Sequence, residues 1–125
     1  TSPYFPAWVA TVPADIKAAR SAILARDLEA LGVVMERSAL RMHASMLGAN
    51  PPIRYWKSSS VWGMDAVESL RAKGLGAWWT MDAGPNMKVL CQAADALEVK
   101  QRMSTLADRV EVLEPGEGAH LVEDN

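Results

Sequence analysis

Residues 77–91 carry the sequence AWWTMDAGPNMKVLC. Two short apolar segments, 77–81 and 87–91, flank the segment 82–86, which is rich in residues that favour turns. Apolar segments of this length, bounded by glycine and turn residues, are typical of β-strands. The stretch therefore predicts an antiparallel hairpin. At Ala77 the pattern changes from helical spacing to short aromatic runs, so the part of the chain before the hairpin is expected to be helical.

The most regular helical pattern begins after Asp27, a residue type that caps helix N-termini. Apolar residues then recur at steps of three or four, which is the repeat of one helical face. This helix is expected to end at Gly48 and the Pro51-Pro52 pair. The residues of its apolar face are Leu28, Leu31, Met35, Ala39, Met42 and Met46.

A shorter helix is predicted on each side of this one. The first is expected to run from Pro13, because proline suits the first helical turn, to about Arg26. The other is expected to begin within residues 58–60 and to end at Lys73-Gly74. The predicted inner faces are Ile16, Ala19 and Ile23 in the first and Met64, Val67 and Leu70 in the second.

The residues after the hairpin predict one more helix and two more strands. Apolar residues step by three or four from Ala96 to Val110, so a fourth helix is expected there. Residues 110–113 and 119–122 are short apolar runs separated by a loop and are predicted to be strands. The fold class that follows is α+β, with helices layered on an antiparallel sheet of about four strands.

Length and composition limit the class of protein. The chain has 125 residues, 50% of them hydrophobic and 22% charged, which is typical of one globular domain. No apolar run approaches the roughly 20 residues that span a bilayer, so no membrane segment is expected. The net charge is -2 without a dense Lys/Arg cluster, so nucleic acid is not an expected partner. A single cysteine, Cys91, favours the reducing cytoplasm, and a zinc site is not expected.

The turn that begins at Asp82 is the most informative place in the sequence for chemistry. A carboxylate at the end of an apolar strand has a rigid backbone and opens into a loop, where Gly84 lets the backbone approach a ligand and Pro85 fixes the path out. The alternative is a plain hairpin turn, because the same residue types favour turns. The histidines are interpreted as structural, with His43 packed at a helix edge with its hydrogen bond satisfied and His120 at the surface.

Several aromatic residues indicate contact with a further domain or subunit. Trp78 and Trp79 are adjacent in a predicted strand and therefore point to opposite faces. One of them is expected in the core and the other against a partner. Tyr4, Phe5 and Trp8 near the N-terminus are expected to be exposed on the same surface.

Three stretches of the chain carry a family resemblance. The most specific is 79–86, WTMDAGPN, followed by Lys88-Val89-Leu90. The others are 40–44, LRMHA, with its continuation through Pro51-Pro52, and the N-terminal TSPY with Trp8-Val9. In this order they resemble the bacterial diphosphomevalonate decarboxylases, of the galactokinase, homoserine, mevalonate and phosphomevalonate kinase superfamily. The likeness covers nearly the whole chain.

The resemblance implies that residues 1–125 are the C-terminal domain of a two-domain enzyme. In that superfamily this half is a ferredoxin-like α+β layer. The N-terminal domain, absent from this chain, carries the ATP phosphate loop, a substrate-gripping arginine and most contacts to the diphosphate. The domain alone is therefore expected to be inactive.

The implied reaction is the ATP-dependent decarboxylation of mevalonate 5-diphosphate to isopentenyl diphosphate, carbon dioxide, ADP and phosphate. Asp82 matches the family's catalytic aspartate, and Ala83 and Gly84 match the loop that borders the substrate. ATP and Mg²⁺ are implied as cofactors, held mainly by the absent domain, with no metal ligand in this chain. The implied partners are the substrate, the N-terminal domain and a second copy in a homodimer. Alternatives are a phosphomevalonate decarboxylase, a mevalonate 3-kinase, or an isolated domain that serves only packing and dimerisation.

Overall fold

The computed structural model describes residues 1–118 of the chain. Within these residues it contains four α-helices, a short 3₁₀ helix and a two-stranded sheet. The α+β class expected from the sequence is confirmed. In chain order the elements are α1 (Phe5–Ala25), α2 (Leu28–Leu47), α3 (Ser58–Ala72), β1 (Ala77–Met81), β2 (Met87–Cys91), η1 (Ala93–Asp95) and α4 (Ala96–Met103).

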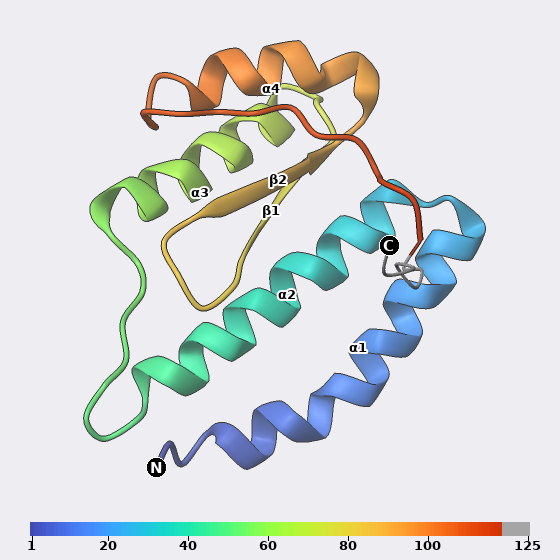
Figure 1. Cartoon of the computed structure of the whole chain (residues 1–125). Coiled ribbons are helices and arrows are strands. Elements are labelled where there is room, and N and C mark those ends of the chain that lie inside the picture. Colours follow the sequence, from blue (N-terminus) through green and yellow to red (C-terminus); the bar gives the residue numbers. More distant parts are fainter. Residues whose placement is uncertain (119–125) are drawn as a thin grey trace, which may run out of the picture.

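The elements are arranged in layers with the hairpin between helices (Figure 1). On one side α2 packs against β1, and α1 packs along α2. On the other side α3 contacts both strands, and α4 packs on α3. The turn of the hairpin, residues 82–86, projects from these layers, and all of its residues except the half-buried Gly84 are exposed.

The predicted antiparallel hairpin is confirmed. β1 and β2 pair in a register that places Trp79 opposite Val89 and Met81 opposite Met87. Within residues 1–118 the sheet has these two strands alone, fewer than the four or so expected. The hairpin therefore depends on the flanking helices for burial, because a two-stranded ribbon alone is only marginally stable in water.

The predicted strand at 110–113 is wrong. Val112 and Leu113 are 54% and 82% exposed, so this segment buries too little apolar surface to stabilise pairing with the sheet. The other predicted strand, 119–122, lies outside the described residues.

α4 ends at Met103, well before Val110, where the apolar spacing predicted its end. The hydroxyl of Ser104 donates to the carbonyl oxygen of Lys100 at 2.8 Å. A serine hydroxyl that bonds to the carbonyl four residues earlier destabilises a helix slightly. Beyond Leu106, residues 107–109 are exposed, so a continued helix would have little apolar surface to bury there.

α1 also differs from the prediction. It begins at Phe5, so that Pro13 lies inside the helix, on its exposed side. Ile16 and Ile23, predicted to face inward, are 64% and 60% exposed. The stripe toward α2 contains a charged residue, which obscured it in the sequence. Its members are Trp8, Val12, Asp15, Ala19 and Ala22, the buried and half-buried residues at steps of three and four.

α2 and α3 form as predicted. The Asp27 side chain accepts a hydrogen bond from the Ala30 N–H at 2.9 Å, which caps the N-terminus of α2. The predicted inner face of α3 is buried, and its middle residue, Val67, has no exposed surface. These helices were predictable because the apolar positions repeat without interruption.

The core lies where β1 meets α2, α3 and α4, and both strand tryptophans belong to buried surfaces. Trp79 is 3% exposed within this core. Trp78 is 7% exposed and lies against Gly32 of α2, where an added Cβ would approach the indole ring to 2.1 Å. The expectation that one tryptophan faces a partner is therefore wrong, because helices cover both faces of β1.

Candidate functional site

Asp82 follows β1 directly and opens the turn. Its side chain is 78% exposed and forms an ion pair with Lys88 of β2. The N–H of Gly84 donates to the carbonyl oxygen of Asp82 at 2.8 Å, which fixes the backbone after the aspartate. The carboxylate thus stands at the end of a paired strand and faces solvent.

Ala83 and Gly84 continue the same turn. Ala83 is exposed, and a Cβ built on Gly84 would meet no atom within 4 Å. Open space therefore lies beside the backbone at Gly84. The structure places all three residues predicted for the site on one accessible turn.

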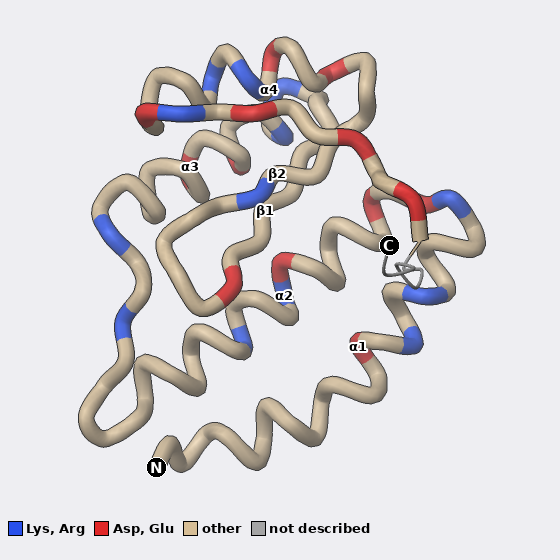
Figure 2. The backbone as a smooth tube through the Cα atoms, viewed as in Figure 1, with Lys and Arg blue, Asp and Glu red and all other residues tan. Residues whose placement is uncertain are grey.

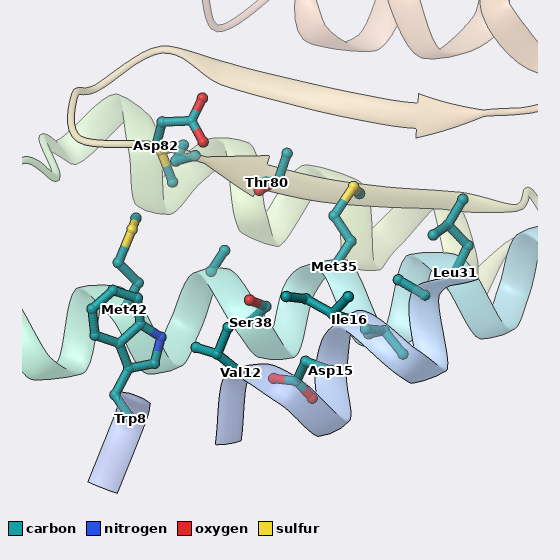
Figure 3. Close-up of a pocket in the computed structure, with 14 residues that line it drawn as sticks. Trp8, Val12, Asp15, Ile16, Leu31, Met35, Ser38, Met42, Thr80 and Asp82 are labelled. Atoms are coloured by element: carbon teal, nitrogen blue, oxygen red, sulfur yellow. The ribbon is translucent and has the colours of Figure 1, made fainter. Parts of the chain in front are cut away.

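A groove of about 320 Å³ runs between α1 and α2 and reaches the end of β1 (Figure 3). Thr80 and Asp82 contribute to it from the hairpin, and Trp8 and Met42 lie toward the Asp82 end. Its other lining residues are mainly apolar side chains of α1 and α2, such as Met35. The apolar face of α2 predicted from the sequence thus lies partly along this groove.

His43 of α2 lies behind the end of β1. Only 2% of the residue is exposed, and its Nε2 atom is 3.1 Å from the carbonyl oxygen of Met81, the residue before Asp82. A carbonyl oxygen can only accept a hydrogen bond, so Nε2 carries the hydrogen. The Trp56 ring packs beside the imidazole with centroids 5.2 Å apart. The predicted packed histidine with a satisfied hydrogen bond is confirmed.

Glu36 and Arg71 hold the other part of β1, and the sequence analysis missed both. Glu36 Oε1 accepts hydrogen bonds from the Trp79 backbone N–H at 3.0 Å and from Arg71 Nη1 at 2.6 Å. The same Arg71 nitrogen donates to the carbonyl oxygen of Ala77 at 2.7 Å. A glutamate in mid-helix usually faces solvent, so no sequence signal marked it as a partner of the strand backbone.

Asp15 joins α1 to α2. One carboxylate oxygen accepts from Arg37 Nη2 at 2.7 Å, and the other accepts from Arg41 Nη1 at 2.9 Å. Desolvation acts to raise the pKa of Asp15, but the hydrogen bonds and charges of the two arginines outweigh it and hold the pKa below its usual range. The side chain is therefore ionised and structural.

In the part of the chain that the structure describes, no cluster of three or more His, Cys, Asp or Glu residues could hold a metal ion. Burial raises the pKa of the Cys91 thiol, and the charge of Asp95 acts in the same direction. Cys91 is therefore a neutral thiol at neutral pH.

None of the described helices is long and apolar enough to cross a membrane.

Comparison with known families agrees with this arrangement. Residues 1–117 match the family described as the mevalonate 5-diphosphate decarboxylase C-terminal domain. The chain belongs to that family. The resemblance noted in the sequence is thereby confirmed. Among curated protein sequences, none matches the chain.

Solved structures of mevalonate diphosphate decarboxylases share the fold. The enzyme from Enterococcus faecalis is 39% identical over 84% of this chain, with a TM-score of 0.80. The enzyme from Staphylococcus aureus is 35% identical over 86% of this chain, with a TM-score of 0.82. MDDEF in complex with MVAPP, AMPPCP and magnesium is 39% identical over 84% of this chain, with a TM-score of 0.80. The chain spans 33% of the first two chains and 32% of the third, about a third of each.

Proposed function

We propose that this chain is the C-terminal domain of an ATP-dependent mevalonate 5-diphosphate decarboxylase and that Asp82 is its catalytic residue. The observation that carries the proposal is the exposed Asp82 carboxylate at the end of β1, in a chain that belongs to this domain family. The complete enzyme converts mevalonate 5-diphosphate and ATP into isopentenyl diphosphate, carbon dioxide, ADP and phosphate.

Asp82 acts first as a general base. Its carboxylate orients the tertiary 3-hydroxyl group and accepts the proton as the hydroxyl oxygen bonds to the transferred phosphoryl group and ADP leaves. After this proton has passed to solvent, phosphate leaves from the same carbon. The carbon–carbon bond to the substrate carboxylate breaks at that stage, and its electrons form the double bond to the tertiary carbon. The carboxylate leaves as carbon dioxide. The negative charge of Asp82 stabilises the cationic character of the carbon during this elimination.

The neighbouring residues shape the substrate side of the turn. Ala83 and Gly84 border the substrate, and the open space beside Gly84 lets it approach the backbone. Lys88 orients the Asp82 carboxylate through their ion pair. ATP is the second substrate and Mg²⁺ accompanies it. We assign the binding of both mainly to the N-terminal domain, as the resemblance to this enzyme family implies.

The N-terminal ATP-binding domain is the proposed partner of the first half of α1. Residues 1–14 contain no Asp, Glu, Lys or Arg, and Figure 2 shows this end of the chain without charged positions. Tyr4 and Phe5 are 60% and 52% exposed, as expected, whereas Trp8 is half-buried. An uncharged surface with exposed aromatic rings is suited to packing against another domain. We further propose a homodimeric enzyme in the cytoplasm, where a single cysteine such as Cys91 stays reduced.

The test is an assay of the full-length enzyme with mevalonate 5-diphosphate, its 5-monophosphate and mevalonate, each with magnesium ATP. We expect ADP and carbon dioxide in equal amounts, with the diphosphate as the preferred substrate. A preference for the monophosphate would make the enzyme a phosphomevalonate decarboxylase. ADP without carbon dioxide would make it a 3-kinase. A lack of turnover with all three would leave the domain a packing and dimerisation role only.

A further inference from the structure

We propose that His43 is a positioning residue that sets the orientation of Asp82 through the backbone carbonyl group of Met81. The inference rests on the proposed function, because it assumes that Asp82 is the catalytic carboxylate. It starts from one contact between α2 and the end of β1, the hydrogen bond from His43 Nε2 to the Met81 carbonyl oxygen at 3.1 Å.

The contact acts on Asp82 because of peptide geometry. The carbonyl oxygen of Met81 lies in the same rigid plane as the N–H and Cα of Asp82. A hydrogen bond that fixes this oxygen therefore fixes where the Asp82 Cα lies and how its side chain leaves the backbone. The next peptide plane is fixed as well, since the Gly84 N–H donates to the Asp82 carbonyl oxygen at 2.8 Å. Both planes that flank Asp82 are thus held.

His43 is itself held firmly enough to transmit position. It is 2% exposed on α2, and Met81 has no exposed surface. The Trp56 ring lies against the imidazole with an interplanar angle of 48°, which limits rotation of the ring. The histidine thus connects a rigid helix to the residue before an exposed carboxylate.

Packing alone does not account for a histidine at this position. Burial of an imidazole costs free energy unless its polar atoms are bonded, so an apolar side chain fills a core position at lower cost. The strand itself does not need the bond to pair, because Met81 is already opposite Met87 in the hairpin. The distinctive effect of His43 is on the peptide plane that leads to Asp82.

The first experiment compares His43→Gln with His43→Asn in the full-length enzyme. The amide nitrogen of glutamine reaches about the place of Nε2 and can donate to Met81, whereas the shorter asparagine cannot reach that oxygen. We expect kcat to fall about 100-fold in His43→Asn, the effect of a misplacement of about 1 Å, with KM unchanged. His43→Gln should recover most of that loss. Val67→Ala, at a fully buried position of α3, is the control and should lower the melting temperature without changing kcat below it.

A second experiment uses the full-length enzyme without any substitution, so that it does not depend on a variant that folds. We expect nuclear magnetic resonance to show His43 with its proton on Nε2 and that proton protected from exchange with solvent. A neutral ring protonated on Nδ1, or a rapidly exchanging Nε2 proton, would overturn the inference.

The kinetic outcomes separate the two proposals. If Asp82→Asn is inactive while His43→Asn keeps full kcat, only the positioning role of His43 is wrong. If kcat falls equally in His43→Gln and His43→Asn, the hydrogen bond to Met81 is not the cause and the inference is overturned. If Asp82→Asn itself keeps full turnover, the proposed function fails and the positioning role fails with it.

Discussion

The Asp15 carboxylate of α1 accepts two hydrogen bonds from the Arg37 guanidinium of α2, at 2.7 Å from Nη2 and 3.2 Å from Nε. Arg41, one helical turn further along α2, reaches the other carboxylate oxygen at 2.9 Å. The Asp15 side chain is 8% exposed, whereas those of Arg37 and Arg41 are 42% and 38% exposed. The carboxylate is therefore the buried member of a triad that joins the two helices on one side of the groove.

Replacement of Asp15 by Asn should destabilise the domain by about 2 kcal/mol at neutral pH, the usual scale for loss of hydrogen bonds to a charged group. The half-exposed arginines keep access to water, so the loss should stay below that of a fully buried pair. Urea unfolding of the 125-residue chain measures the difference. Asp65→Asn, at an exposed position of α3, is the matched control and should change stability by less than about 0.5 kcal/mol.

The ionised Asp15 carboxylate also predicts how the stability of the domain depends on pH. The folded-state pKa of Asp15 lies below the ordinary value of 3.8, so the ionised form is favoured by folding. Its contribution is complete above the unfolded-state pKa and is lost as the pH falls through the lower, folded-state pKa. The stability gap between the original chain and Asp15→Asn should therefore be constant near neutrality and shrink below pH 3.8. A gap of the same size at pH 3 and pH 7 would contradict the assignment.

How much of the fold the sequence predicts depends on whether its signals are local. The hairpin around the 82–86 turn and the helix after Asp27 follow from turn residues, a cap and an uninterrupted apolar repeat. The buried face of α1 does not, because Asp15 occupies it and Pro13 interrupts the pattern. The burial of the Asp15 charge is explained only by its ion pair with Arg37, which lies in a different helix.

In the candidate site, too, the residues adjacent in sequence were predicted, whereas the contacts contributed by a distant helix were not. Asp82, Ala83 and Gly84 are contiguous, so the sequence places them together without knowledge of the fold. The side chains of His43 and Glu36 bond to backbone atoms of the strand. These atoms are the carbonyl oxygen of Met81 and the N–H of Trp79. Backbone atoms are common to all residues, so no side-chain pattern indicates which of them a distant helix will contact.

Gly32→Ala should destabilise the domain because of Trp78. Alanine gains about 1 kcal/mol over glycine in a helix interior. Its Cβ, however, would lie 2.1 Å from the Trp78 ring, which is itself only 7% exposed. The ring or the helix must shift to accept this atom, and overpacking costs about 1–3 kcal/mol. Thermal unfolding should show a net loss, whereas Gly116→Ala, in open space, should be nearly neutral. An unchanged or higher melting temperature for Gly32→Ala would show that the indole ring shifts easily.

The 125-residue chain alone should bind ATP only weakly. It contains no GxxxxGK[ST] or GxGxxG loop that could cradle phosphates, and we assign the nucleotide to the N-terminal domain. Calorimetry with magnesium ATP should give a Kd weaker than about 1 mM, which corresponds to a binding free energy of less than about 4 kcal/mol in magnitude. A micromolar Kd would move the nucleotide site onto this domain. The full-length enzyme is the positive control for the titration.

Replacement of Asp82 by Asn in the full-length enzyme should lower kcat by roughly three orders of magnitude or more. Asparagine keeps the size of the side chain but cannot accept the hydroxyl proton or supply negative charge. Loss of a positioned base alone costs about 10²–10⁴-fold, and loss of electrostatic stabilisation adds to it. KM should change little, because most contacts to the diphosphate are assigned to the other domain. Steady-state kinetics and thermal unfolding measure both effects, with Asp108→Asn, at an exposed position of the described C-terminal segment, as control. If Asp82→Asn retains more than about a tenth of kcat with its fold intact, Asp82 is only a turn residue, because a missing general base costs at least about 100-fold.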